Sequence, residues 1–167
     1  IRILAASMVE KANSGHPGGA MGGADFVNVL FSEFLIYDPK NPKWEGRDRF
    51  FLDPGHMSPM LYSVLALSGK FTLDELQQFR QWGSVTPGHP EVDVMRGIEN
   101  TSGPLGQGHT YAVGAAIAAK FLKARLGEEV MNQTIYAYIS DGGIQEEISQ
   151  GAGRIAGTLG LDNLIMF

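Results

Sequence analysis

Hydrophobic and polar positions along the chain follow two periods, one typical of helices and one typical of buried strands. The mainly apolar run at residues 49–52 predicts a short strand, the short apolar run at residues 135–139 predicts a buried strand, and residues 163–167 begin a third. After the second run, apolar residues recur at helical spacing and predict a helix with one apolar face. The residues on this face are Ile144, Ile148, Ala152, Ile155, Ala156 and Leu159.

Further helices are predicted from the same spacing and from local start and stop signals. An opening helix ends before Asn13, because Pro17 and the glycines beside it cannot continue it. Thr72 and Glu75 match a capping box and start a helix that ends near Trp82. The other predicted helices cover about residues 23–35, 60–67 and 109–126. Because strands alternate with helices, the chain predicts an α/β fold with a largely parallel sheet flanked by helices.

Length, charge and composition narrow the class of protein. The 167 residues predict one domain with a sizeable core. With 13 basic and 18 acidic residues, a net charge of −5 and no basic run, nucleic acid is not expected as a partner. No apolar run reaches membrane-spanning length and no signal peptide is visible, so we expect a cytoplasmic protein without a membrane partner. The absence of cysteine excludes disulfide and thiol chemistry, and the start at Ile1, inside a helical pattern, predicts further residues before it.

The first candidate site follows the strand predicted at residues 135–139. Asp141 stands at the end of this strand, and Gly142 and Gly143 lead into a helix. A carboxylate at a strand end can hold a hard cation such as Mg²⁺, while glycine and the helix N–H groups admit an anion such as a diphosphate. The same residues also suit an Asp-Gly turn that only caps the helix.

Three of the four histidines lie in loops beside glycine or proline: His16, His56 and His89. A neutral imidazole can donate to a phosphate or hydroxyl and can exchange a proton near neutral pH. Zinc is the weaker alternative, because no two histidines have helical ligand spacing and there is no cysteine. His109 opens a predicted helix and is interpreted as structural. The glycine-rich segment at residues 102–108 lacks the features of a Walker or Rossmann loop and alone predicts only a turn into a helix.

Taken together, these loops resemble transketolase. The resemblance covers nearly the whole chain and corresponds to the N-terminal, diphosphate-binding domain of that family, so residues 1–167 are expected to form part of it, with the sheet incomplete at the C-terminal end. Its most specific segment is the Pro-Gly-His-Pro-Glu loop. The motifs are Ser14-Gly15-His16-Pro17-Gly18, Gly55-His56, Pro87-Gly88-His89-Pro90-Glu91, residues 102–108, and Asp141-Gly142 with Gln145-Glu146.

The resemblance implies a thiamine diphosphate-binding fold and a set of cofactor contacts. Asp141 is expected to ligate Mg²⁺ or Ca²⁺, and the Gly142 amide to contact the diphosphate. His56 is expected on the diphosphate side as well. Gly103 and Leu105 are expected to line the aminopyrimidine and thiazolium rings.

The resemblance also implies the reaction and its other residues. A two-carbon ketol unit moves from a ketose phosphate to an aldose phosphate, a step of the pentose phosphate pathway. His16 and His89 are expected to be catalytic and to bind the donor ketose, and Glu146 to join a carboxylate network at a dimer interface. The full-length protein is expected to be a homodimer, or to pair with a subunit that carries the pyrimidine-binding domain.

Two other functions remain open from the sequence. Deoxyxylulose phosphate synthase and 2-oxo acid dehydrogenases share the Asp-Gly metal motif but resemble the histidine loops less well. A non-catalytic interaction or regulatory module would use an exposed apolar face. The apolar residues that offer such a face are expected in the core instead, because apolar residues at helical spacing usually pack inward. They are Phe26, Phe31, Phe34 and Trp44.

The chain departs from the family pattern in several places. Ser140 and Glu147 stand where the family usually has glycine, and His56 follows Asp53-Pro54-Gly55 instead of a Ser-Ala/Asn-Gly segment. Family members also use an asparagine and a backbone carbonyl as metal ligands, from a loop beyond Phe167, and a glutamate on a separate pyrimidine-binding domain. We therefore expect this chain alone to bind the cofactor weakly and to be inactive.

Overall fold

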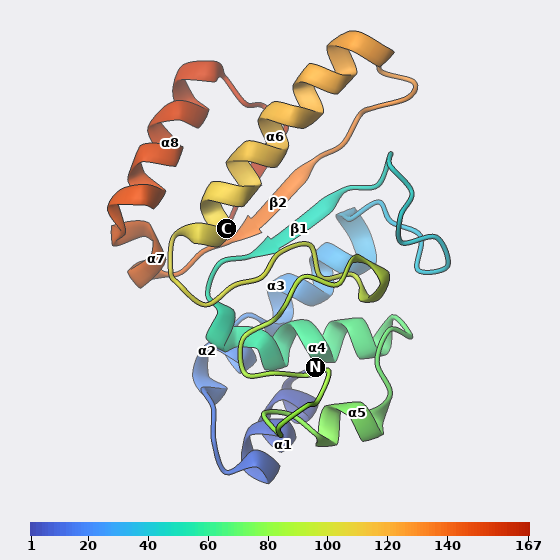
Figure 1. The fold of residues 1–167 in the computed structure, drawn as a ribbon, viewed down its shortest axis with the longest axis vertical. Coiled ribbons are helices and arrows are strands. Elements are labelled where there is room, and N and C mark those ends of the chain that lie inside the picture. Colours follow the sequence, from blue (N-terminus) through green and yellow to red (C-terminus); the bar gives the residue numbers. More distant parts are fainter. The chain divides into compact units, whose positions relative to one another are not determined.

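The computed structural model describes residues 1–167, which divide into two compact units (Figure 1). The helical unit consists of Ile1–Leu35 and Gly55–Thr101. The sheet unit consists of Ile36–Pro54 and Ser102–Phe167. Each unit is therefore built from two separate stretches of the chain.

The sheet unit contains a three-stranded sheet in the order β1-β2-β3, in which both pairs of neighbouring strands are parallel. Arg49 is paired with Ile135, and Ile135 is paired in turn with Leu164. The strands lie where the apolar runs predict them, and the parallel sheet of the predicted fold is confirmed. Their bounds are β1 (Arg49–Leu52), β2 (Ile135–Tyr138) and β3 (Leu164–Met166).

Two long helices of the sheet unit, α6 (Gln107–Leu126) and α8 (Glu147–Leu159), lie beside each other in Figure 1. The alanines of α6 make close packing possible, because a methyl side chain keeps the helix axis near its neighbours. The resulting core contains Phe51, Ala112, Ala116, Ile135 and Ala137, with Val113, Ala152 and Ala156 in a second cluster.

The helix predicted after β2 is interrupted. A short helix, α7 (Asp141–Gln145), ends at Glu146, whose backbone is extended (φ −65°, ψ 133°), and α8 then begins. The predicted apolar face is also only partly correct, since Ala152 and Ala156 are buried while Ile148 and Ile155 are 51% and 52% exposed. Small side chains fill the contact with α6, so the larger apolar ones lie outside it.

The helical unit packs around α4 (Ser58–Leu67), whose residues are buried almost throughout. A proline begins the short helix α2 (Pro17–Gly22), because proline is well suited to the first helical position. A loop was predicted there from the sequence. The remaining helices of this unit are α1 (Arg2–Ala12), α3 (Ala24–Val29) and α5 (Leu73–Gln77), with a π-helical turn at Leu30–Phe34 and 3₁₀ turns at Gly55–Met57 and Val94–Arg96.

Two expectations for the helical unit need correction. The predicted capping box of Thr72 and Glu75 is present, but α5 ends at Gln77 and does not continue to Trp82. Arg80 adopts a left-handed conformation (φ 61°), and its N–H donates to the carbonyl of Thr86 (3.0 Å), so the chain turns away from the helix. The helix predicted at residues 23–35 is divided into α3 and the π-helical turn.

The aromatic residues expected in the core are only partly buried. Phe34 is 62% exposed and Trp44 is 41% exposed, so the core prediction is wrong for both. Phe26 and Phe31 are half-buried.

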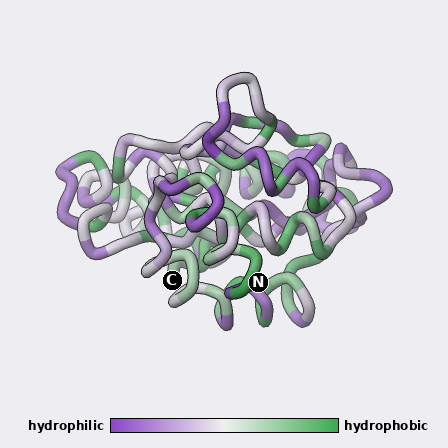
Figure 2. The backbone as a smooth tube through the Cα atoms, turned by 90° about the horizontal axis from the view of Figure 1, so that it is seen from below, coloured by the Kyte–Doolittle hydropathy of each residue, from purple (hydrophilic) through white to green (hydrophobic).

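Hydrophobic and hydrophilic stretches are interspersed along the whole backbone (Figure 2). No helix combines the length and apolar character that crossing a lipid bilayer requires.

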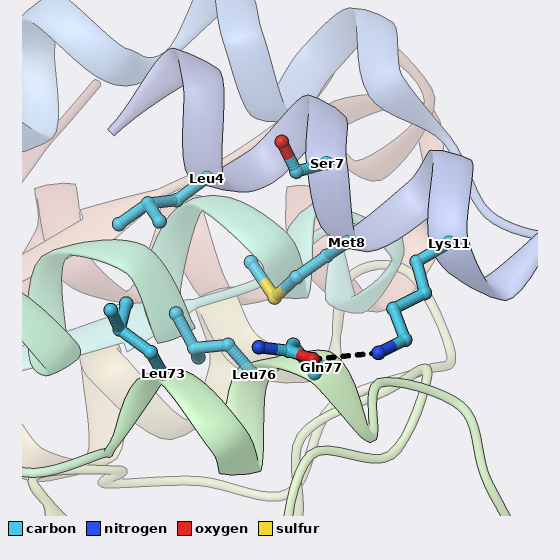
Figure 3. A pocket seen from close by; sticks show the side chains of 7 residues that line it. All are labelled: Leu4, Ser7, Met8, Lys11, Leu73, Leu76 and Gln77. Carbon is cyan, nitrogen blue, oxygen red and sulfur yellow. Dashed lines mark hydrogen bonds between the residues drawn. The ribbon is translucent and has the colours of Figure 1, made fainter.

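A pocket of about 390 Å³ lies between α1 and α5 in the helical unit (Figure 3). Leucine and methionine side chains make most of its wall, and Lys11 Nζ donates to Gln77 Oε1 (2.7 Å) at its polar edge. None of the predicted site residues lines it. The lining residues are Leu4, Ser7, Met8, Lys11, Leu73, Leu76 and Gln77.

Candidate functional site

The predicted site residues divide between the two units. The three loop histidines, His16, His56 and His89, belong to the helical unit. The sheet unit holds the predicted metal ligand, the other cofactor residues and the predicted interface residue: Asp141, Gly142, Gly103, Leu105 and Glu146.

Asp141 is the first residue of α7 and lies at the carboxyl end of β2, as predicted. Ser140, not Asp141, caps this helix, because the Gly143 N–H donates to Ser140 Oγ (3.0 Å). The Asp141 side chain is exposed and accepts no hydrogen bond from the protein, and the Gly142 N–H has no protein acceptor. A free carboxylate next to a free amide can bind a cation and an anion together.

The loop before α6 lies directly against the turn that contains Asp141. A Cβ atom on Gly142 would lie 3.1 Å from Leu105 Cδ1, so these two predicted cofactor residues are in contact. Gly106 has φ 88° and approaches Glu146 in the same way, with 3.0 Å between a Cβ at position 106 and the Glu146 Cβ. The structure thus brings Leu105, Gly142 and Glu146 together around Gly106, and Gly103 lies in the same loop.

Asp53 also belongs to this arrangement but was not predicted from the sequence, where it stood only as part of a departure from the family pattern before His56. Asp53 follows β1, is 0% exposed, and accepts hydrogen bonds from the Gly106 N–H (3.1 Å, Oδ2) and the His109 N–H (3.2 Å, Oδ1). A sequence signal for it exists. Asp53 follows β1 as Asp141 follows β2, and the carboxyl ends of parallel strands meet at one edge of a sheet.

His109 lies in the first turn of α6 and is buried, which agrees with its interpretation as structural. Its Nδ1 lies 2.5 Å from Ser149 Oγ of α8. Burial lowers the pKa of His109, against the opposing effect of the nearby Asp53 charge, so the neutral imidazole is favoured. His109 therefore joins α6 to α8.

Two of the loop histidines are in contact within the helical unit. The rings of His16 and His56 are 5.1 Å apart between centroids and meet edge to face. His16 is the N-cap residue of α2, and His56 lies in the 3₁₀ turn Gly55–Met57. A Cβ on Gly19 would lie 3.0 Å from Met57 Cγ, so α2 packs closely on this turn and holds the two rings together.

His89 lies in a loop that two side chains of α4 hold in place by hydrogen bonds to its backbone carbonyls. Ser58 Oγ donates to the carbonyl of Gly88 (2.7 Å), and the Tyr62 hydroxyl donates to that of Pro87 (2.8 Å). Partial burial lowers the pKa of His89, and the charges of Arg80 and His16 lower it further. His89 is therefore neutral near pH 7 and can accept a hydrogen bond or a proton.

Arg80 is a second residue that sequence reasoning missed. Its Nη1 donates to Ser14 Oγ (2.8 Å), and a Cβ on Gly88 would lie 2.8 Å from its Nε. Arg80 thus contacts the loop before His16 and the loop that carries His89. No sequence signal marks it, because it lies inside a predicted helix and acts only through the left-handed turn.

The donor groups of the sheet unit fit part of a metal–diphosphate site. Asp141 offers one carboxylate, Gly142 offers a backbone N–H without a side chain in front of it, and Leu105 offers an apolar surface beside them. No group of three or more histidine, cysteine, aspartate or glutamate side chains converges on one point. Mg²⁺ prefers six oxygen ligands, so the Asp141 carboxylate could supply only part of what such a site needs.

Comparison with known proteins identifies relatives over the whole length of the chain. The family model "Transketolase, thiamine diphosphate binding domain" matches residues 1–167. Transketolase 1 of Pasteurella multocida is 50% identical over 171 residues, covering 100% of this chain and 26% of the relative, and the transketolase of Rhodobacter capsulatus is 50% identical over 168 residues, covering 99% and 25%. The chain therefore spans about a quarter of the length of the curated relatives that it matches.

Solved structures show the same similarity in three dimensions. The transketolase of Leishmania mexicana superposes with a TM-score of 0.95 at 43% identity, covering 99% of this chain and 25% of that one. The transketolase of Campylobacter jejuni gives a TM-score of 0.94 at 49% identity, covering 99% and 26%. The backbone described above is thus closely similar to the corresponding quarter of these proteins.

Proposed function

Because the chain belongs to the transketolase family, we propose that residues 1–167 form part of the diphosphate-binding domain of an enzyme that transfers a two-carbon ketol unit. The donor is a ketose phosphate and the acceptor an aldose phosphate. The observation that carries this proposal is the pair of free groups at the end of β2, the Asp141 carboxylate and the Gly142 N–H, with Leu105 beside them. We extend the proposal to a cytoplasmic homodimer in the pentose phosphate pathway.

The residues of the sheet unit would hold the cofactor. Asp141 would bind Mg²⁺ or Ca²⁺, whose charge offsets that of the diphosphate, and the Gly142 N–H would donate to a diphosphate oxygen. Gly103 and Leu105 would line the rings. The bound cofactor supplies a nucleophile for the ketose carbonyl and stabilises the negative charge left after carbon–carbon cleavage.

The histidines of the helical unit would bind polar groups of the cofactor and the sugar. His56 would donate to the diphosphate. His16 and His89 would bind hydroxyl groups of the donor ketose, and the lowered pKa of His89 keeps it able to accept a proton at neutral pH. Glu146, exposed at the break between α7 and α8, would belong to a carboxylate network between subunits.

The proposal is tested on the full-length protein with thiamine diphosphate and Mg²⁺. We expect ketol transfer from a ketose phosphate to an aldose phosphate and no turnover with pyruvate as donor. Asp141→Asn should raise the half-saturating Mg²⁺ and cofactor concentrations at least about tenfold, since it removes one charged ligand. Asp74→Asn, at an exposed position of α5, is the matched control and should leave both unchanged.

Several results would contradict the proposal. Turnover with pyruvate in place of a ketose phosphate would favour another thiamine diphosphate enzyme. Binding of a protein partner without any cofactor-dependent turnover would favour an interaction module. If Asp141→Asn has the same half-saturating Mg²⁺ and cofactor concentrations as the wild type, Asp141 is not the metal ligand.

A further inference from the structure

Asp53 is a carboxylate without any exposed surface, at the carboxyl end of β1. No lysine or arginine forms an ion pair with it. A buried charge without a cationic partner needs hydrogen bonds in its place, because burial removes the water that would otherwise solvate it. Both oxygens of Asp53 receive such a bond from backbone N–H groups.

These two donors belong to the start of α6. Gly106 is the N-cap residue of this helix and has no side chain to cap it, and His109 is the third residue after it. Asp53 therefore does for α6 what an N-cap aspartate does for its own helix, although it lies 53 and 56 positions before its two donors. Its negative charge also lies at the positive end of the helix dipole.

The other side of the Asp53 carboxylate faces the first turn of α7. A Cβ atom at position 143 would lie closer to Asp53 Oδ2 than the 3.0 Å below which Cβ atoms essentially never come. The carboxylate cannot swing aside, because the two N–H groups from α6 hold its oxygens. Glycine at position 143 leaves room for the Asp53 carboxylate in the place where these N–H groups hold it.

We propose that Asp53 is a positioning residue, which sets the spacing between the loop at residues 103–106 and the turn at residues 141–143 and makes glycine obligatory at position 143. Asp53 joins the end of β1, the start of α6 and the first turn of α7 into one unit. The contact between Leu105 and Gly142 depends on this spacing. The part of the inference that concerns the cofactor rests on the proposed function, whereas the pairing of Asp53 with Gly143 stands without it.

A consequence for ligand binding follows from the charge of Asp53. A helix N-terminus usually attracts an anion, but that of α6 already has one from the protein itself. We expect the diphosphate to bind at the free Gly142 amide and not at the start of α6. The glycine-rich loop then contacts the cofactor through Gly103 and Leu105 alone.

The experiment is a double-mutant cycle of Asp53→Ser and Gly143→Ala in the full-length protein, with the Tm measured without cofactor. In the wild-type background, Gly143→Ala should lower the Tm by about 2 °C or more, because overpacking a rigid contact is destabilising. In the Asp53→Ser background, where the space is open, Gly143→Ala should leave the Tm unchanged or raise it, since alanine favours a helix over glycine. If Asp53→Ser does not fold, Asp53→Asn replaces it and should remove only part of the Gly143→Ala effect.

The second readout is the half-saturating concentration of thiamine diphosphate. Asp53→Ser should raise it about tenfold or more while the KM for the ketose phosphate stays unchanged, which separates a positioning role from a loss of stability alone. Asp48 offers a matched control, because it is also buried and accepts two backbone hydrogen bonds, from Ile36 (3.0 Å) and Thr134 (2.8 Å). Asp48→Ser should lower the Tm without changing the cofactor requirement or the effect of Gly143→Ala.

The outcomes that overturn the inference are distinct from those that overturn the proposed function. An equal Tm loss from Gly143→Ala in both backgrounds disproves the pairing. An unchanged cofactor requirement in Asp53→Ser disproves the positioning role. Failure of the wild-type protein to transfer a ketol unit would reject the proposed function, and the cycle measured by Tm would still decide the pairing.

Discussion

Gly108 is the position where the structure predicts the sharpest effect of adding one methyl group. A Cβ on Gly108 would lie 2.5 Å from Asp53 Cα, and 2.9 Å from both Asp53 N and the carbonyl oxygen of Leu52. All three are backbone atoms of the β1 end, so no side chain can rotate away. Gly108→Ala therefore forces α6 and β1 apart by nearly 1 Å, relative to the ordinary contact distance of 3.4 Å.

The cost follows from the bonds that this movement strains. Overpacking alone typically costs about 1–3 kcal/mol. The same shift weakens the strand hydrogen bond from the Asp53 N–H to the Tyr138 carbonyl (2.9 Å) and the two bonds from α6 to the Asp53 carboxylate, each of which contributes about 1 kcal/mol or more. After the helix-favouring effect of alanine is subtracted, about 2–4 kcal/mol of local destabilisation remains.

Hydrogen–deuterium exchange of the full-length protein measures this destabilisation at individual amides. Amides at the start of α6 should exchange roughly 30-fold to 1,000-fold faster in Gly108→Ala, at tenfold per ~1.4 kcal/mol. Gly114→Ala is the control in the same helix, since no atom lies within 4 Å of its Cβ, and it should slow exchange through better helix propensity. Equal protection in the two variants would refute the close approach of α6 and β1.

Three further predictions follow from the same structure. Hydrogen bonds from the Arg96 side chain and the Thr72 backbone lower the pKa of Glu75 to about 2, so Glu75→Gln should reduce stability at pH 7. In acid denaturation, this difference from the wild type should fade as the pH falls from 4.5 through about 2, and a loss that persists at pH 2 would contradict the prediction. Arg80→Gln should raise the pKa of His89, measured by NMR titration, whereas Arg154→Gln on α8 should not; a lower pKa would contradict the assigned effect of the Arg80 charge. The isolated 167-residue chain should show no ketol transfer, and activity with this polypeptide alone would refute that.

The elements that the sequence predicted well are those whose signal is local. β1 and β2 lie within one residue of the apolar runs, and the capping box of Thr72 and Glu75 has the predicted hydrogen bonds. The end of α5 could not be predicted, because it depends on the left-handed backbone of Arg80. The break at Glu146 was missed for a similar reason, since apolar spacing continues across it without interruption.

In the candidate site too, residues with a local signal could be predicted and those that depend on distant contacts could not. Asp141 could be placed at a strand end from the sequence, because the apolar run and the glycines adjoin it. Ser140 was noted only as a departure from the glycine of the family pattern, although it caps α7. Asp53 escaped notice because its partners lie 53 and 56 positions away, and only the packing of α6 against β1 brings them to it. Contacts at such separation are decided by topology and not by local pattern.

The parallel sheet also sets the order in which the chain can fold during synthesis. Arg49 of β1 is paired with Ile135 of β2, 86 positions later in the chain, so β1 leaves the ribosome long before its neighbouring strand exists. Phe51 meanwhile lacks both α6 and β2, which cover it in the finished core. An unpaired apolar strand is prone to aggregation. We therefore expect aggregation to compete with folding while the nascent chain ends between β1 and β2.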